Sequence, residues 1–165
     1  MNEDTFLRVI QQYAAPLARV AAGYVVDAGE QDDLLQEIHF ALWRALPGFR
    51  GESSELTFVL SVAHNRGITF AARSKRRQTS PLPAAVPDPR VTLDGDVERH
   101  ERAASLYAAI RQLPAGQRQA IMLRLEGLSG KEIAAAQGTT ENNVNVRLNR
   151  ARAALRSLLG HLEGN

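Results

Sequence analysis

The chain has 165 residues, a formal net charge of +2 and no cysteine. The lack of cysteine excludes disulfides, thiolate metal sites and cysteine catalysis, and it fits a reducing cytosol. The segment MNEDTFLRVI has no signal-peptide pattern and no run approaches about 18 apolar residues, so we expect a cytoplasmic protein without direct membrane insertion.

Charge is distributed unevenly along the chain. Residues 1–60 hold four Lys/Arg and nine Asp/Glu, whereas residues 61–80 hold five basic residues and no acid. A second acid-free stretch, residues 147–156, carries four arginines. Two basic patches beside an acidic surface indicate a polyanion that is contacted at two places.

Helical periodicity dominates the first part of the chain. We expect one helix from Glu3 to about Val26, kinked or interrupted at Pro16, a second from near Glu30 to Leu46, and a third from Leu56 to about Lys75. The core candidates are Phe6, Ile10, Leu17, Val20, Leu34, Leu35, Ile38, Leu42, Leu46, Val59, Val62, Ile68 and Phe70.

The pattern changes after residue 77. Residues 78–97 are interpreted as a flexible linker, because residues 78–96 contain four prolines and little periodicity. Helices are expected again at about 98–112 and 116–126. The sequence therefore predicts an all-α protein with two small helical domains, residues 1–77 and 98–163, on a flexible tether.

The segment LSGKEIAAAQGTTENNVNVRL, residues 128–148, has the layout of a helix-turn-helix. Ser129 and Glu132 match a capping box, Gly138 suits a left-handed helix end, and Thr140 can cap the next helix. The spacing predicts that this second helix buries Val144, Leu148, Ala151 and Leu155 and turns outward Glu141, Asn142, Asn143, Asn145 and Arg147.

Two interpretations of this unit remain open from spacing alone. Asparagine can pair with adenine and arginine with guanine in the major groove, and helix N-termini and threonine hydroxyls suit phosphates. An ordinary helical hairpin with a solvated polar face would show the same pattern. Clustered asparagines are poor helix formers, and the arginines from 147 to 156 favour DNA binding.

The helix near residues 30–46 carries a polar stripe of Asp33, Gln36 and Glu37. Such a stripe alone is most often a solvated surface, and a metal site would need convergence with a histidine that one helix cannot supply. We expect Trp43 to be a core residue, and His64 to be a surface or hydrogen-bonded histidine rather than a catalytic base.

Three ordered segments resemble the extracytoplasmic-function (ECF) group of bacterial RNA polymerase sigma factors, in the sigma-70 family. These segments are DDLLQEIHFALW (residues 32–43), FRGESSELTFVLSVAHNRGITFAARSKRR (49–77) and LPAGQRQAIMLRLEGLSGKEIAAAQGTTENNVNVRLNRARAAL (113–155). The resemblance implies region 2 in the first domain and region 4 in the second, a transcription initiation factor, and no catalytic activity.

The resemblance also implies the roles of individual residues. Asp33, Gln36 and Glu37 would dock on the clamp coiled coil of the largest polymerase subunit, and region 4 would meet the polymerase flap. The minus-ten promoter element, with a flipped base at the loop, would contact Phe49, Arg50, Gly51, Glu52, Ser53, Asn65, Arg66, Arg73, Arg76 and Arg77. The minus-thirty-five element would contact Thr139, Thr140, Glu141, Asn142, Asn143, Asn145, Arg147 and Arg150.

The expected partners are core RNA polymerase, promoter DNA and an anti-sigma factor that can hold the protein at the inner membrane; no cofactor, metal or small-molecule substrate is expected. One alternative is a stand-alone helix-turn-helix regulator that binds an operator as a dimer, but the sequence has no long heptad seam. Another is a helical enzyme using Asp33, Glu37 and a histidine; no H-E-x-x-H, Gly-rich phosphate loop or G-x-S-x-G occurs.

Overall fold

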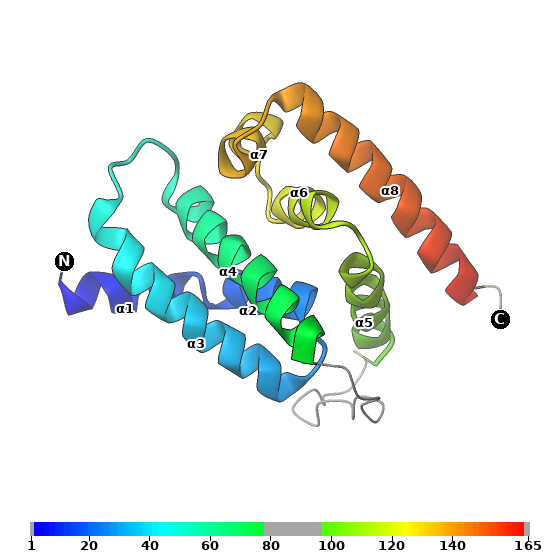
Figure 1. Ribbon diagram of the computed structural model, residues 1–165, viewed down its shortest axis with the longest axis horizontal. Helices are drawn as coiled ribbons and strands as arrows, with labels where there is room; N and C mark the ends of the chain where they lie inside the picture. Colours follow the sequence, from blue (N-terminus) through cyan, green and yellow to red (C-terminus); the bar gives the residue numbers. More distant parts are fainter. Residues whose placement is uncertain (1, 78–96, 164–165) are drawn as a thin grey trace.

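A computed structural model describes residues 2–77 and 97–163. Over these residues the chain forms eight α-helices and one short 3-10 turn, without a strand, so the predicted all-α class is confirmed (Figure 1). The predicted linker lies outside the described residues except for Val97, which begins a helix. The elements are α1 (Glu3–Gln12), α2 (Ala14–Tyr24), α3 (Ala28–Ala45), η1 (Leu46–Gly48), α4 (Glu55–Arg77), α5 (Val97–Arg111), α6 (Ala115–Leu125), α7 (Gly130–Gln137) and α8 (Glu141–Glu163).

The first expected helix is two helices that meet at Tyr13. Proline lacks an N–H and its ring clashes with the carbonyl four residues earlier, which here belongs to Gln12. The break therefore lies one turn before Pro16. Pro16 itself lies in the first turn of α2, where a missing N–H leaves no helical hydrogen bond unmade.

The α3–α4 pair forms the centre of the first half of the molecule, residues 2–77. Asp27 caps α3 by accepting a hydrogen bond from the N–H of Glu30 at 2.9 Å. Several core candidates are fully buried as predicted, whereas others are only half-buried. The buried ones include Leu17, Val20, Leu34, Ile38, Leu42 and Val59; Phe6, Ile10, Leu35, Val62, Ile68 and Phe70 are the half-buried ones.

The prediction that Trp43 is a core residue is wrong. Its side chain is 42% exposed, and the Phe6 ring meets it edge-on at 5.1 Å and 87°. Phe40, one turn earlier on the same helix, is 62% exposed. Spacing along α3 alone does not separate these positions from buried ones, because their exposure depends on which other helices pack against them.

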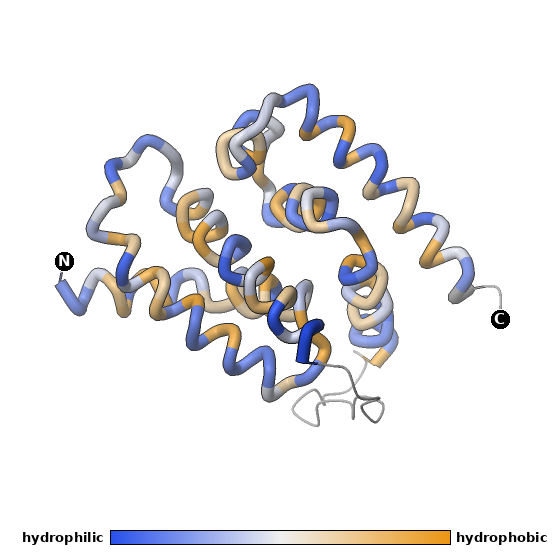
Figure 2. The backbone as a smooth tube through the Cα atoms, in the orientation of Figure 1, coloured by the Kyte–Doolittle hydropathy of each residue, from blue (hydrophilic) through white to orange (hydrophobic). Residues whose placement is uncertain are grey.

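The second half, residues 97–163, contains α5 to α8, and α8 packs on the other three helices. The predicted inner face of α8 is confirmed, since Val144, Leu148, Ala151 and Leu155 are all buried. Hydrophobic positions lie on the helix sides that face one another, and polar positions lie outside (Figure 2).

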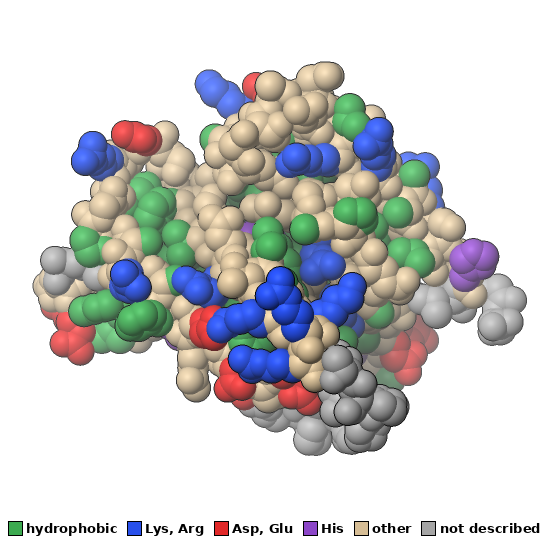
Figure 3. All heavy atoms as spheres, viewed as in Figure 1, with side chains coloured by type: hydrophobic (Ala, Val, Ile, Leu, Met, Phe, Trp, Pro, Cys, Tyr) green, Lys and Arg blue, Asp and Glu red, His purple; other side chains and the backbone are tan. Residues whose placement is uncertain are grey.

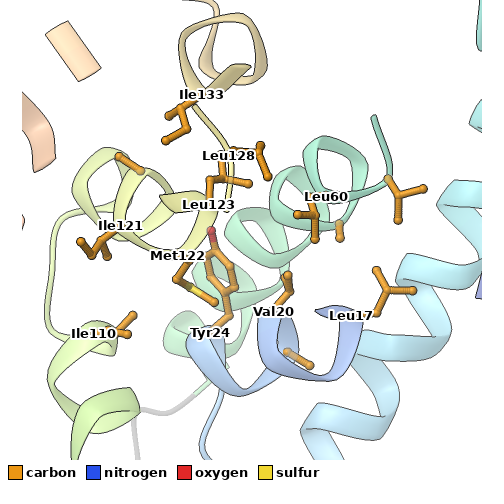
Figure 4. Packing of buried hydrophobic residues seen from close by; sticks show 14 of the residues in the cluster. Leu17, Val20, Tyr24, Leu60, Ile110, Ile121, Met122, Leu123, Leu128 and Ile133 are labelled. Carbon is orange, nitrogen blue, oxygen red and sulfur yellow. The ribbon is translucent and has the colours of Figure 1, made fainter. Parts of the chain in front are cut away.

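The two halves pack directly against each other. Helix α2 contacts α5 and α6, and α4 contacts α6 and α7. Their buried apolar side chains form one continuous cluster across the boundary. Figure 4 shows this cluster, in which Tyr24 of the first half lies beside Met122 and Leu123 of the second. The cluster continues into the first half with Val20, Leu60 and Leu17, and into the second with Ile110, Ile121, Leu128 and Ile133.

Candidate nucleic-acid and protein interfaces

The loop between α3 and α4 encloses an open hollow of about 330 Å³. Gly51 has a φ of 73°, a left-handed conformation that favours glycine and turns the chain around the hollow. The rings of Phe49 and Phe58 lie obliquely against each other with their centroids 4.8 Å apart, and together they form the apolar wall of the hollow. The lining residues are Gly48, Phe49, Arg50, Glu52, Ser53 and Phe58, which include four of the five loop residues predicted to contact DNA.

Glu55 anchors the end of this loop to the first helix. Arg8 donates to both of its oxygens at 2.9 and 2.7 Å, and the Tyr13 hydroxyl donates to it at 3.0 Å. The hydrogen bond from Arg8 lowers the pKa of the Glu55 carboxyl despite partial burial. The loop is thus fastened to α1, a contact 47 residues apart in sequence that spacing does not reveal.

A second hollow, of about 430 Å³, lies between α3 and α4 and contains the predicted Asn65 and Arg66. Asn65 is exposed and Arg66 is half-buried. Arg44, which the sequence did not single out, lines the same hollow from α3. The sequence gave no signal for Arg44 as a DNA contact, because only the pairing of α3 with α4 brings it next to Asn65. On α3 it lies on the same side as Asp33 and Glu37, with which it lines a further hollow.

The acidic stripe on α3 is divided by its contacts. Asp33 and Gln36 are exposed, but Glu37 accepts hydrogen bonds from Nη2 of Arg73 at 2.8 and 2.7 Å. Both side chains of this ion pair remain partly open to solvent, at 36% for Glu37 and 44% for Arg73. Glu37, which is predicted to contact polymerase, therefore forms an ion pair with Arg73, which is predicted to contact DNA.

Basic side chains gather at the C-terminal end of α4. Lys75, Arg76 and Arg77 occupy its last turn and are exposed. Figure 3 shows a group of blue Lys and Arg side chains on this face of the molecule, with red carboxylates beside it. Cations at this end of a helix also interact favourably with the helix dipole, so the patch stabilises α4 whether or not a polyanion is bound.

The helix-turn-helix forms as local rules predict. The Ser129 hydroxyl accepts from the N–H of Glu132 at 3.2 Å, and the Glu132 carboxylate accepts from the N–H of Ser129 at 2.7 Å, which completes the capping box. Gly138 has a φ of 63° and ends α7 in the left-handed conformation. Thr140 caps α8 by accepting from the N–H of Asn143 at 3.2 Å.

The polar residues at the start of α8 fall into two groups. Asn142 and Asn145 are exposed, as is Arg150. Asn143 instead donates from Nδ2 to the Thr139 hydroxyl at 2.9 Å, and Arg147 is half-buried with Nη1 donating to Oε1 of Gln137 at 2.9 Å. Asn143 and Arg147 therefore brace the turn and α7, whereas Asn142 and Asn145 present free polar edges.

A buried aromatic pair lies at the boundary between the halves. The Tyr24 hydroxyl and Nδ1 of His64 are 2.7 Å apart, and Nε2 of His64 has no partner among the described residues. Burial, with a smaller contribution from the charge of Arg118, lowers the pKa of His64 to about 3. The sequence predicts that His64 is either a surface residue or a hydrogen-bonded one. It is buried, and one of its two ring nitrogens is hydrogen-bonded.

We expect this histidine to make stability fall at mildly acidic pH. In the unfolded chain His64 binds a proton near pH 6.5, whereas the folded chain keeps it neutral to about pH 3, so lowering the pH favours unfolding. Between pH 7.5 and 5.5 the loss is about 1.4 kcal/mol from this residue. Urea unfolding at the two pH values measures it.

The matched control for this prediction is His64→Gln, which keeps an acceptor for Tyr24 and removes the titration. Burial also lowers the pKa of His39, so a smaller acid sensitivity remains in the control. Equal acid sensitivity in the two proteins would show that His64 is not the group responsible.

Comparison with known proteins finds two family models that match successive parts of the chain. The family model "Sigma-70 region 2" matches residues 9–77, and "Sigma-70, region 4" matches residues 103–155. Among the described residues, no group of His, Asp and Glu is arranged to hold a metal ion, and no helix is long and apolar enough to cross a membrane.

Several individual proteins resemble the chain over most of their length. The RNA polymerase sigma-H factor of Pseudomonas aeruginosa is 31% identical, over 93% of this chain and 86% of its own. The ECF RNA polymerase sigma factor SigX of Bacillus subtilis is 29% identical, over 98% of this chain and 85% of its own.

Two solved structures share the fold. One is CnrH in complex with the cytosolic domain of CnrY, with a TM-score of 0.69 and 23% identity, over 97% of this chain and 90% of that one. The other is the sigma factor RpoE in complex with the anti-sigma factor NepR from Bartonella quintana, with a TM-score of 0.71 and 21% identity, over 94% and 97%.

Proposed function

The chain belongs to the ECF group of the sigma-70 family, as an alternative sigma factor, and from this membership we propose that it works through three surfaces. One face of α3 binds core RNA polymerase, the α3–α4 loop with α4 binds and helps open the minus-ten element, and the start of α8 reads the minus-thirty-five element. The single observation that supports this most strongly is the pairing of a loop hollow in region 2 with a capped helix-turn-helix in region 4.

The proposed polymerase surface is the exposed side of α3. Asp33 and Gln36 supply polar contacts, and the exposed Phe40 and Trp43 supply apolar ones on the same helix. Protein interfaces commonly combine an aromatic anchor with a polar surround. We propose that the clamp coiled coil of the polymerase's largest subunit binds here, and that the flap binds region 4.

The proposed minus-ten surface combines a hollow with nearby positive charge. The hollow beside Phe49 and Phe58 has room for an unpaired base and an aromatic ring on which it can stack. Unpairing a base costs a few kcal/mol, which stacking and pocket contacts offset. Arg66, Arg76 and Arg77 would attract the flanking phosphates, an interaction that salt weakens.

At the minus-thirty-five element we propose that Asn142 and Asn145 contact base edges. Arg150 would contact phosphate, and Thr139, Thr140, Glu141, Asn143 and Arg147 would orient the helix. We also propose an anti-sigma factor as the regulator and the cytoplasm as the place of action, since one structural neighbour was solved with the anti-sigma factor NepR and the other with the cytosolic domain of CnrY.

Asn142→Ala is expected to weaken binding by about 1–3 kcal/mol at one upstream base pair, because a bidentate asparagine–adenine pair carries that much discrimination. Asn143→Ala removes the Asn143–Thr139 hydrogen bond and is expected to reduce binding equally across sequences. The measurement is a competition assay of the polymerase holoenzyme on promoters mutated one position at a time. Uniform loss from Asn142→Ala would contradict base reading by this residue.

The experiment that tests the proposed function is run-off transcription with purified core polymerase on fragmented genomic DNA, followed by sequencing of the transcript 5′ ends. We expect discrete starts that require this protein and share two spaced upstream motifs. No starts, with an active control sigma factor on the same core, would contradict it.

A further inference from the structure

A large apolar side chain lies among the polar residues on the outer face of α8. Val146 is 39% exposed, and among the described side chains of α8 it is the one large apolar residue that is exposed. At about 3.6 residues per turn, it points about 170° away from the mean direction of the buried residues of this helix, Val144, Leu148, Ala151 and Leu155. Val146 therefore points away from α5, α6 and α7, on which α8 packs.

Helix formation gives no reason for a valine at this position. Valine loses side-chain freedom in a helix and is a weaker helix former than alanine, and at an exposed site no packing compensates for this. Single exposed apolar residues are common on protein surfaces, but the neighbours of this one are distinctive. Asn142 lies one turn before it, and Asn145, Asn149 and Arg150 flank it, all of them exposed. Val146 therefore lies within the face that is proposed to contact the minus-thirty-five element.

The major groove of DNA offers a valine one apolar partner, the C5-methyl group of thymine. The other groups that distinguish base edges there are hydrogen-bond donors and acceptors, which an apolar side chain leaves unpaired. Helix-turn-helix proteins contact base edges with the N-terminal residues of their second helix, and Val146 is the sixth residue of α8. An apolar side chain at this place therefore favours a base pair that contains thymine.

We propose that Val146 is a specificity-determining residue, which contacts the methyl group of a thymine in the minus-thirty-five element. This inference rests on the proposed function and adds a base contact that is not a hydrogen bond. Asn142 and Val146 lie about 6 Å apart along the helix axis, and stacked base pairs are about 3.4 Å apart. The thymine therefore lies within about two base pairs of the base that Asn142 contacts.

The test is competition binding of the polymerase holoenzyme to a promoter identified from its transcript 5′ ends. Each thymine of the upstream element, on both strands, is replaced in turn by deoxyuridine, which lacks the methyl group and keeps every hydrogen-bonding group. We expect one replacement to weaken binding about fourfold, the effect of losing one buried group of methyl size. With Val146→Ala we expect similarly weaker binding of the unmodified promoter, and no further effect of the same deoxyuridine.

Val97→Ala is the matched control, because it makes the same truncation at an exposed site on α5. It is expected to keep the full response to deoxyuridine. Val146→Thr keeps one methyl group in the same branched shape and is expected to retain part of the response. Thermal unfolding of Val146→Ala is expected at or above the wild-type temperature, since alanine is the better helix former, and this separates a loss of binding from a loss of folding.

Three results would overturn the contact. The first is a promoter that is read without dependence on any thymine methyl group, and the second is an equal deoxyuridine effect in wild type and Val146→Ala. The third is a responsive thymine farther than about two base pairs from the position that Asn142→Ala affects. Absence of any promoter, beside an active control sigma factor on the same core, would instead contradict the proposed function and this inference with it.

Discussion

Asp33→Arg combined with Glu37→Arg is expected to reduce binding to core RNA polymerase by roughly 100-fold or more, because reversing charges in a complementary interface costs several kcal/mol. Asp33 is exposed and Glu37 contributes only a partly exposed ion pair to the fold, which is worth about 0–1 kcal/mol. The loss should therefore appear in polymerase binding, measured by fluorescence anisotropy of the labelled protein, while thermal unfolding changes by a few degrees at most.

The matched control is Glu98→Arg combined with Glu101→Arg, which makes the same change of charge on the exposed face of α5. We expect it to bind polymerase nearly as tightly as wild type. If both double variants bind equally well, α3 is not the docking surface. If both lose binding equally, net charge rather than the α3 stripe is responsible.

The second large effect is expected in stability, from Gly67→Ala. A Cβ at this position would lie 2.6, 2.8 and 2.9 Å from Cδ2, Cε2 and Cγ of Tyr24. The ring has little room to move, because it is buried, its hydroxyl is hydrogen-bonded to His64, and the Arg118 guanidinium lies 5.2 Å from its centroid. We expect a loss of about 1–3 kcal/mol in the free energy of unfolding, the usual range for overpacking, although alanine is the better helix former.

Two other glycines provide graded controls for the same change. Gly23→Ala meets only the flexible end of Met122, so it is expected to cost less than Gly67→Ala. Gly160→Ala in α8 meets nothing within 4 Å and is expected to stabilise by about 0.5–1 kcal/mol through helix propensity. Urea unfolding of the three variants gives the order, and a Gly67→Ala protein as stable as wild type would show that the Tyr24 ring is not held in place.

Local rules explain which features the sequence predicted correctly. The Ser129 capping box, the left-handed Gly138 and the Thr140 cap each depend on residues within four positions of one another. The periodicity of α8 also identified its buried face, since α5, α6 and α7 all pack on one side of it. The resemblance to a family located the same unit independently.

The features that sequence missed depend on contacts between distant segments. Trp43 is 42% exposed although the Phe6 ring lies edge-on against it. His64 is buried, and its hydrogen-bond partner Tyr24 lies 40 residues away in sequence and 2.7 Å away in space. Asn143 and Arg147 match the pattern of base-reading residues, but their side chains bind Thr139 and Gln137. The spacing of residues along a helix predicts the direction in which a side chain points, but not which residues it contacts.

The ion pair between Glu37 and Arg73 has a thermodynamic consequence under the proposed function. Polymerase would engage Glu37 and promoter phosphate would engage Arg73, yet in the free protein each neutralises the other. The partner that binds first breaks the ion pair, so the second partner binds without that free-energy cost. Thermodynamic linkage makes this cooperativity reciprocal. Bound DNA would therefore raise the affinity for polymerase by the same factor by which bound polymerase raises the affinity for DNA.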